Sequence, residues 1–147
     1  MEAVLFLIGG RVYTWIEILW RGFTHWSMFL LGGGCFVIMG LLNEYRFRWN
    51  QSLILQSVIS AVVITVLEFI TGCIVNLWLG WEVWDYSELT CNFLGQISLM
   101  YFLLWIPLSM LGIFLDDWIR YCLYLILHKA FPKMEKRERP KYSLFRA

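Results

Sequence analysis

Long apolar stretches dominate this chain, and charged residues interrupt them at few positions. A helix of about 20 residues, rising about 1.5 Å per residue, crosses the hydrocarbon core of a bilayer. Four stretches reach that length, and we predict a membrane-spanning helix in each. The four predicted spans cover about residues 3–22, 26–43, 53–79 and 92–115.

The segment 118–131 follows two consecutive carboxylates, Asp116 and Asp117, and is too short to cross the bilayer again. Its polar residues recur at four-residue steps opposite apolar ones, which predicts an interfacial helix. Residues 1–131 would then form a single membrane domain. The remainder, 132–147, is a basic tail that suits the anionic cytoplasmic leaflet.

Composition agrees with an all-α integral membrane protein. Of the 147 residues, 60% are hydrophobic and 16% are charged, which leaves too little polar surface to cover a soluble globule. The net charge is +1, and the spans carry no basic stripe, so we expect no nucleic-acid partner. We expect a multi-pass protein of the cell membrane whose first partner is the lipid bilayer.

The basic residues are unevenly placed, and this predicts an orientation. No Lys or Arg lies between Arg48 and Arg120, whereas eight of the twelve basic residues lie from Arg120 onward. Positive charge concentrates on the cytoplasmic side of membrane proteins, so the loop containing Arg46 and the basic tail should be cytoplasmic. Both termini are then cytoplasmic, and the acidic, aromatic loop 78–92 lies outside.

Glu68 is the leading candidate for a functional residue. It lies within the predicted span 53–79, where a carboxylate is costly and is tolerated mainly when it faces protein or water. Small and polar residues share its helical face, and we expect that face to pack on other helices. These neighbours are Ser57, Ala61, Thr65, Gly72 and Asn76.

Other polar residues extend the candidate substrate-binding or ion-binding site. Glu17 precedes Arg21 by one helical turn, so this pair is either part of the site or a simple ion pair near a helix end. Asp85, among aromatic residues, is either a cation-attracting rim or part of a solvated turn. The complete candidate set is Glu17, Arg21, His25, Glu68, Asn76, Asp85, Asn92 and Gln96.

A short, gapped internal repeat relates the two halves of the chain. The sequence ending in Glu17 is echoed by the one ending in Glu68, and Asn43 with Glu44 is echoed by the pair 116–117. This pattern predicts two helical hairpins that enter the membrane from the same side as a parallel duplication. Glu17 and Glu68 would then be counterparts.

The same residues resemble the CmpB-type family of bacterial ABC-transporter permeases, from Gly9 to Arg120. The resemblance implies a small multi-helix membrane protein and, by the family label, a transport role with an ATPase subunit as partner. No phosphate-binding Gly-Lys-Ser or Gly-Lys-Thr sequence is present, and the loop 44–52 is short for docking such a subunit. The motifs that carry the resemblance are Tyr13, Ile16-Glu17, Arg21-Gly22, THWSM (24–28), Gly32-Gly33, Gly40, Asn43-Glu44, EFITG (68–72), Asn76, WDYS (84–87), Asn92, GQI (95–97) and DDWIR (116–120).

Three functions fit these features. In a permease or channel subunit, Glu17, Glu68 and Asn76 would line a polar cavity that binds a cation or protons. In a scaffold or regulatory subunit, the same polar residues would only register the helices. A four-helix monomer encloses little space, so a homo-oligomer or a partner membrane protein is expected for either function.

The third function, an intramembrane enzyme, would use His25 as a base near Ser27, Asp85 and Ser87. The two histidines of the chain have no zinc-ligand spacing, and no cofactor motif occurs. We therefore expect no metal, no cofactor and no catalytic residue, and we prefer transport.

Overall fold

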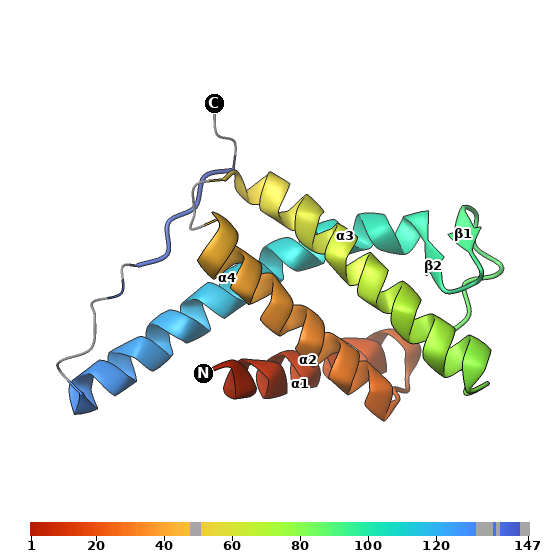
Figure 1. Cartoon of the computed structure of the whole chain (residues 1–147), viewed down its shortest axis with the longest axis horizontal. Helices are drawn as coiled ribbons and strands as arrows, with labels where there is room; N and C mark the ends of the chain where they lie inside the picture. Colours follow the sequence, from red (N-terminus) through yellow and green to blue (C-terminus); the bar gives the residue numbers. More distant parts are fainter. Residues whose placement is uncertain (48–50, 132–136, 138, 145–147) are drawn as a thin grey trace.

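In the residues that it describes, the computed structural model has four long helices and one small hairpin (Figure 1). The helices are α1 (Glu2–Arg21), α2 (Trp26–Leu41), α3 (Leu53–Gly72) and α4 (Leu99–Ala130). By length and composition, each is able to cross a membrane when α2 is followed to Glu44 and α3 to Trp78, so the prediction of an all-α protein with four membrane-length helices is confirmed. The structure describes all residues except 48–50, 132–136, 138 and 145–147.

Two of the helices are extended by π-helical turns. α2 continues into η1 (Leu42–Phe47), and α3 continues into η2 (Cys73–Trp78). The apolar sequence therefore stays helical beyond the regular α-helices, and α3 with η2 forms a candidate span of 26 residues. The extra residue in each π-turn rotates the side chains that follow it, which affects where Asn76 in η2 points.

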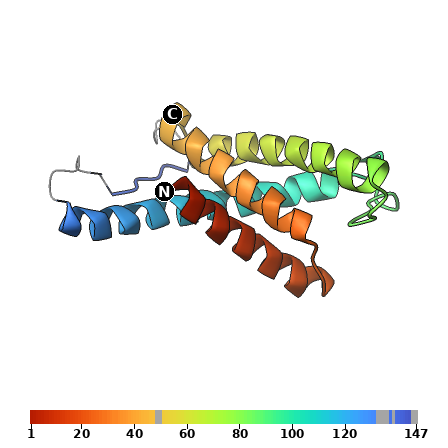
Figure 2. The same ribbon diagram turned by 60° about the horizontal axis from the view of Figure 1, so that its bottom comes forward.

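Helices adjacent in sequence form two antiparallel pairs. α1 packs chiefly on α2, and α3 packs chiefly on α4, while α2 also contacts both α3 and α4 (Figures 1 and 2). α2 is therefore the helix through which the two pairs are joined. Residues 22–25 connect the first pair, and residues 79–98 connect the second.

Glycines allow α1 and α2 to approach closely. A Cβ atom at Gly32 would lie 2.4 Å from the Cβ atom of Tyr13, and one at Gly9 would lie 2.4 Å from that of Phe36. The two contacts are reciprocal, because each helix contributes one glycine and one aromatic ring. Such small-residue contacts replace the hydrophobic effect as the source of helix association in lipid.

The two ends of the bundle are held by different polar contacts. At one end, Arg21 of α1 donates to the backbone oxygen of Val83 at 3.1 Å. At the other, Arg120 of α4 donates to both carboxylate oxygens of Glu2 at 2.8 and 3.0 Å. We call these the loop end, where residues 22–25 and 79–98 lie, and the Arg120 end.

The fourth span starts later than predicted. We expected a helix from about residue 92, but Asn92–Phe93 (β1) pairs with Ile97–Ser98 (β2) in a small antiparallel hairpin, and α4 starts at Leu99. Gly95 in the turn has φ +67°, a conformation that favours glycine. The segment 92–98 is uncharged, but its turn residues favour a hairpin over a helix. Hydropathy alone therefore placed the start of the fourth span too early.

A separate helix over 118–131 is not present. The expected break at Asp116 and Asp117 does not occur, and α4 continues without interruption from Leu99 to Ala130. The two carboxylates do not stop the helix because each has a partner: Asp116 accepts from Nε of Arg120 at 2.7 Å, and Asp117 accepts from Nδ2 of Asn43 at 2.7 Å. Beyond Arg120, α4 projects past the other helices (Figure 1).

Described residues of the basic tail return to the Arg120 end. The ring of Tyr142 lies edge-on to that of Phe114, with centroids 4.4 Å apart, and Leu53 donates its backbone N–H to the oxygen of Ser143 at 2.8 Å. Arg137 forms an ion pair with Glu44. The part of the tail that the structure describes therefore packs on the helices, a contact that its basic sequence, which suits the anionic leaflet, did not predict.

Candidate functional site

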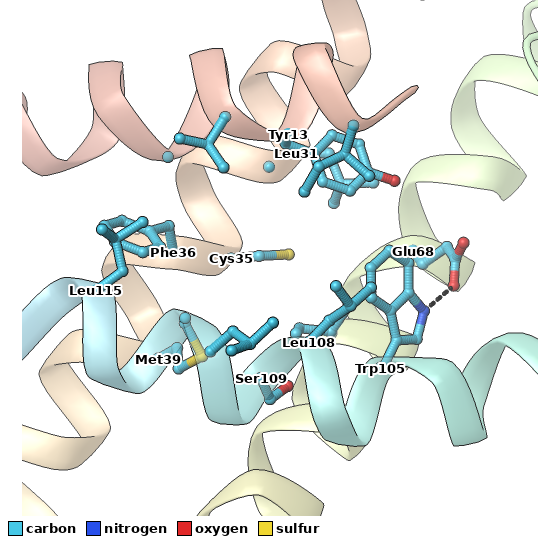
Figure 3. A pocket seen from close by; sticks show the side chains of 17 residues that line it. Tyr13, Leu31, Cys35, Phe36, Met39, Glu68, Trp105, Leu108, Ser109 and Leu115 are labelled. Atoms are coloured by element: carbon cyan, nitrogen blue, oxygen red, sulfur yellow. Dashed lines mark hydrogen bonds between the residues drawn. The ribbon is translucent and has the colours of Figure 1, made fainter. Parts of the chain in front are cut away.

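A cavity of about 240 Å³ lies among the four helices and is lined by residues of all of them. Its walls are mostly apolar. Polar or aromatic side chains reach it from each helix: Tyr13 from α1, Cys35 from α2, Glu68 from α3, and Trp105 with Ser109 from α4 (Figure 3). Of the eight candidate residues predicted from the sequence, Glu68 alone lines this cavity.

Glu68 is 1% exposed and lies at one end of the cavity, beside Trp105 (Figure 3). Its Oε1 atom accepts from the hydroxyl of Tyr86 at 3.0 Å, and its Oε2 atom accepts from the indole Nε1 of Trp105 at 3.0 Å. Both donors are neutral. Among the residues that the structure describes, no Lys, Arg or His forms an ion pair with this carboxylate.

The two donors are themselves held by aromatic stacking. The ring of Trp105 stacks on that of Tyr13, with centroids 6.0 Å apart, and the ring of Tyr86 stacks on that of Tyr101 at 4.3 Å. Burial and the nearby Glu68 carboxylate raise the pKa of Tyr86, so this phenol keeps its proton and remains a donor at neutral pH. The aromatic residues thus fix the position of Glu68 at the end of the cavity.

Glu17 and Arg21 form the predicted pair but lie outside the cavity lining. Oε2 of Glu17 accepts from Arg21 and from the hydroxyl of Thr24, both at 3.0 Å. Arg21 also binds the oxygen of Val83, so the pair ties α1 to the connection 79–98. The charge of Glu17 acts on Glu68, but within the described residues no hydrogen bond joins the two carboxylates.

Asn76 and Gln96 come together, but their amides hold the connection over the loop end. Oδ1 of Asn76 accepts from the N–H of Val83 at 2.7 Å, and its Nδ2 donates to Oε1 of Gln96 at 2.8 Å and to the oxygen of Trp84 at 3.0 Å. Trp84 in turn donates its indole N–H to the backbone oxygen of Gln96 at 3.0 Å. These contacts are structural and leave neither amide facing the cavity.

Asn92 and Asp85 stabilise the turn itself. Nδ2 of Asn92 donates to the oxygens of Ser87 and Leu89, and its Oδ1 accepts from the N–H of Gly95. Asp85 is exposed and accepts from both the hydroxyl and the N–H of Ser87. These hydrogen bonds lower the pKa of Asp85, so it stays ionised in a solvated turn.

His25 caps the start of α2. Its Nδ1 atom lies 2.8 Å from the hydroxyl of Ser27 and accepts from the N–H of the same residue at 3.3 Å. The imidazole also packs on Trp81. In the part of the chain that the structure describes, no hydrogen bond links His25 with Asp85 or Ser87, so the set considered for an intramembrane enzyme is divided into two local pairs.

Sequence reasoning missed several residues around Glu68. Trp105 lies in the middle of the predicted span 92–115, away from the interfacial depth where tryptophan is usual, and this position could have signalled a buried indole that needs an acceptor. Ser109 lies one turn later, is 1% exposed, and its hydroxyl has no hydrogen-bond partner among the described residues. Nothing in the sequence marks Tyr86 as the other partner, because it reaches Glu68 from the connection.

The described residues contain no group of three or more His, Cys, Asp or Glu side chains arranged to hold a metal ion. The sequence model of a family described as "Putative ABC-transporter type IV" matches residues 5–134. No curated protein and no solved structure matches the chain.

Proposed function

This chain belongs to the family described as "Putative ABC-transporter type IV", and from that premise we propose that it is a membrane transport protein, a permease or channel subunit, whose solute site is the cavity beside Glu68. This site contains fewer of the residues that were predicted from the sequence. Glu68 keeps the central role, and Tyr13, Trp105 and Ser109 join it. Glu17, Arg21, Asn76 and Gln96 become the framework of the loop end.

The observation that carries this proposal is a carboxylate buried next to an open cavity. Removing a carboxylate from water costs several kcal/mol, and an apolar side chain would join the helices at lower cost. Glu68 has two neutral donors to hold it in place and faces the cavity. A solute or proton site requires a charged group that is held in place and is accessible from a cavity, and such a group is costly to bury in a membrane without a function.

The proposed orientation places both termini in the cytoplasm. The uneven distribution of Lys and Arg supports it, because the Arg120 end carries the basic tail and the loop end carries the acidic connection. The ion pair between Glu2 and Arg120 supports it too, since the start of α1 lies beside the second half of α4. The Arg120 end would therefore be the cytoplasmic end.

The proposed parallel duplication remains an interpretation of the sequence. Two antiparallel pairs, α1 with α2 and α3 with α4, are the arrangement that it requires. The two segments that the repeat relates, 43–44 and 116–117, also touch, because Asn43 donates a hydrogen bond to Asp117. A homo-oligomer, a partner membrane protein and an ATPase subunit remain proposed partners, the last on the family label alone.

Proton flux into reconstituted vesicles tests the transport role. We expect vesicles that contain the protein and the pH dye pyranine to acidify faster than protein-free vesicles under a potassium diffusion potential. Glu68→Gln should reduce the added flux by about tenfold or more, because a neutral amide cannot carry the proton or attract a cation. The matched control is Glu88→Gln, the same change at an exposed carboxylate of the connection, which should leave the flux unchanged.

Equal flux through the wild type and Glu68→Gln would remove Glu68 from the mechanism. Flux no faster than in protein-free vesicles would contradict proton-coupled transport by the chain alone, and would favour the scaffold or regulatory subunit. The observation that favours the scaffold or regulatory subunit is that the amides of Asn76 and Gln96 are engaged in hydrogen bonds within the protein.

A further inference from the structure

The cavity opens sideways, between α1 and α4. Val12 and Ile16 of α1 line it, as do Leu111 and Leu115 of α4, and all four side chains are also exposed on the outside of the bundle. α1 and α4 flank the cavity (Figure 3) and are not among the helix pairs that pack extensively. Exposed apolar positions on membrane-length helices face lipid, so the opening leads to the bilayer.

The end of the cavity at Glu68 carries a carboxylate, and among the residues that the structure describes no cation forms an ion pair with it. No Lys or Arg occurs from residue 49 to residue 119, so neither α3, nor the connection, nor the first half of α4 offers Glu68 a counter-ion. The charge of Arg21 acts on Glu68 from a distance, but Arg21 itself is engaged by Glu17 and the oxygen of Val83. Charge complementarity therefore calls for a cation from outside the chain.

Aromatic rings beside the carboxylate favour an organic cation over a hydrated metal ion. Tyr13 and Trp105 both line the cavity next to Glu68, and aromatic faces attract ammonium groups most strongly where water is excluded. Most of the remaining wall is apolar. A hydrated inorganic ion would lose water contacts there without gaining polar ones. The hydroxyl of Ser109, which has no hydrogen-bond partner among the described residues, offers one further polar contact.

We propose that this cavity binds a small hydrophobic organic cation, an amine or quaternary ammonium with a short apolar group, which enters from the bilayer between α1 and α4. The proposal rests on the proposed function, because it names the substrate class of the same site. The positive nitrogen lies beside Glu68, against the ring surfaces that Tyr13 and Trp105 turn to the cavity, and the apolar group occupies the rest of the cavity. At about 240 Å³ the space is below the roughly 300–1,000 Å³ of drug-sized sites, so the ligand is small.

Binding to the full chain in nanodiscs of zwitterionic lipid tests this proposal without any transport assay. The probe is radiolabelled benzyltrimethylammonium, measured by equilibrium dialysis. Its matched control is neopentylbenzene, which has the same shape but carbon in place of the charged nitrogen. We expect saturable binding that excess unlabelled cation displaces and that neopentylbenzene does not.

Variants assign the binding to Glu68. Glu68→Gln should weaken it by about tenfold or more, because the charge attraction is lost in a water-poor site. Glu68→Asp keeps the charge and should retain binding within a few-fold, which shows that a loss in Glu68→Gln is not a loss of fold. Glu88→Gln, which changes an exposed carboxylate, should bind as the wild type does.

Several outcomes would overturn the inference. These are no saturable binding by the wild type, equal competition by neopentylbenzene, or unchanged binding by a folded Glu68→Gln. Cation binding without proton flux would contradict the proposed transport function and leave the cation site standing. Proton flux that depends on Glu68 without cation binding would contradict the cation site and leave the proposed transport function standing.

Discussion

At the scale of single residues, the environment of Glu68 decides what the site is able to do. Its two oxygens each have one neutral donor, from Tyr86 and Trp105, and neither donor compensates a full charge. A carboxylate held this way is fixed in place but still open to a proton or a cation. By contrast, Glu17 is neutralised by Arg21 and serves to join α1 to the connection.

Replacing Trp105 with Phe tests whether the indole donor stabilises the buried carboxylate. The change keeps an aromatic ring in the cavity wall but leaves Oε2 of Glu68 without its donor. A buried polar atom without a partner costs about 1 to 3 kcal/mol, so the free energy of unfolding should fall by that amount. Thermal denaturation in detergent micelles measures the change.

Trp78→Phe is the control for this prediction, because Trp78 is 80% exposed and its indole has no described hydrogen-bond partner. Its denaturation midpoint should match that of the wild type. If both variants lost the same stability, the loss would come from ring size, and the hydrogen bond to Glu68 would contribute nothing measurable.

At the scale of the helices, small residues determine how closely α1 and α2 pack, and so how wide the cavity is. Gly32 and Tyr13 both line the cavity and contact each other across the two helices. Gly32, Gly33 and Gly34 stand together in the second predicted span, and small residues are typical of closely packed membrane helices. The sequence does not distinguish which glycines serve such packing, whereas the structure does, because Gly34 has no described atom within 4 Å of the position of an added Cβ.

Gly32→Ala and Gly34→Ala therefore form a matched pair in one helix. The added methyl group at Gly32 would lie 2.4 Å from Cβ of Tyr13, so the helices must separate or the ring must move. We expect a loss of about 1 to 3 kcal/mol from overpacking. Gly34→Ala should be neutral or stabilise the protein by up to about 1 kcal/mol, since alanine is the better helix former. Denaturation midpoints in micelles compare the two, and an equal effect would contradict the close approach at Gly32.

At the scale of the whole molecule, polar contacts gather at the two ends of the bundle and the cavity lies between them. The loop end is held by Arg21, Asn76 and Gln96, and the Arg120 end by Glu2, Asp116 and Arg120. The described tail adds Tyr142 at the Arg120 end, where burial and the nearby Asp117 raise the pKa of this phenol. A transport protein must open such ends to water in turn, whereas a scaffold need not.

Cys35 is a natural reporter for that difference, because its buried thiol lines the cavity. In a variant whose other three cysteines are serine, we expect a charged methanethiosulfonate reagent in the aqueous phase to label Cys35 in reconstituted vesicles. The reason is that a permease admits water to its site during each cycle. Benzyltrimethylammonium should slow the labelling by occupying the cavity.

A cysteine on the lipid-facing side of α3 provides the comparison. Val62→Cys, made in a chain without the native cysteines, places a thiol at a position that is 48% exposed on a membrane-length helix. It should stay unlabelled, because acyl chains exclude the charged reagent. Were Cys35 equally unreactive, the cavity would be closed to water and the scaffold function would be favoured.

Part of the site was predictable because it follows from local sequence. A carboxylate in a long apolar stretch must be received by protein or water, so Glu68 stood out at once. Asn76, Asn92 and Gln96 stood out for the same reason, but their amides turned out to fold the connection over the loop end. Polarity within a span marks a residue that needs partners, and it does not say whether those partners are backbone groups or a ligand.

Four membrane-length helices and a buried carboxylate follow from the order of residues alone, because hydropathy and the cost of burying charge act locally along the chain. Which groups meet that carboxylate depends on how the helices pack. Tyr86 and Trp105 lie 18 and 37 residues beyond Glu68, and they reach it because the connection folds back and α4 packs on α3. The continuity of α4 was decided in the same way, since the partners of Glu2, Asn43 and Arg120 come from distant parts of the chain.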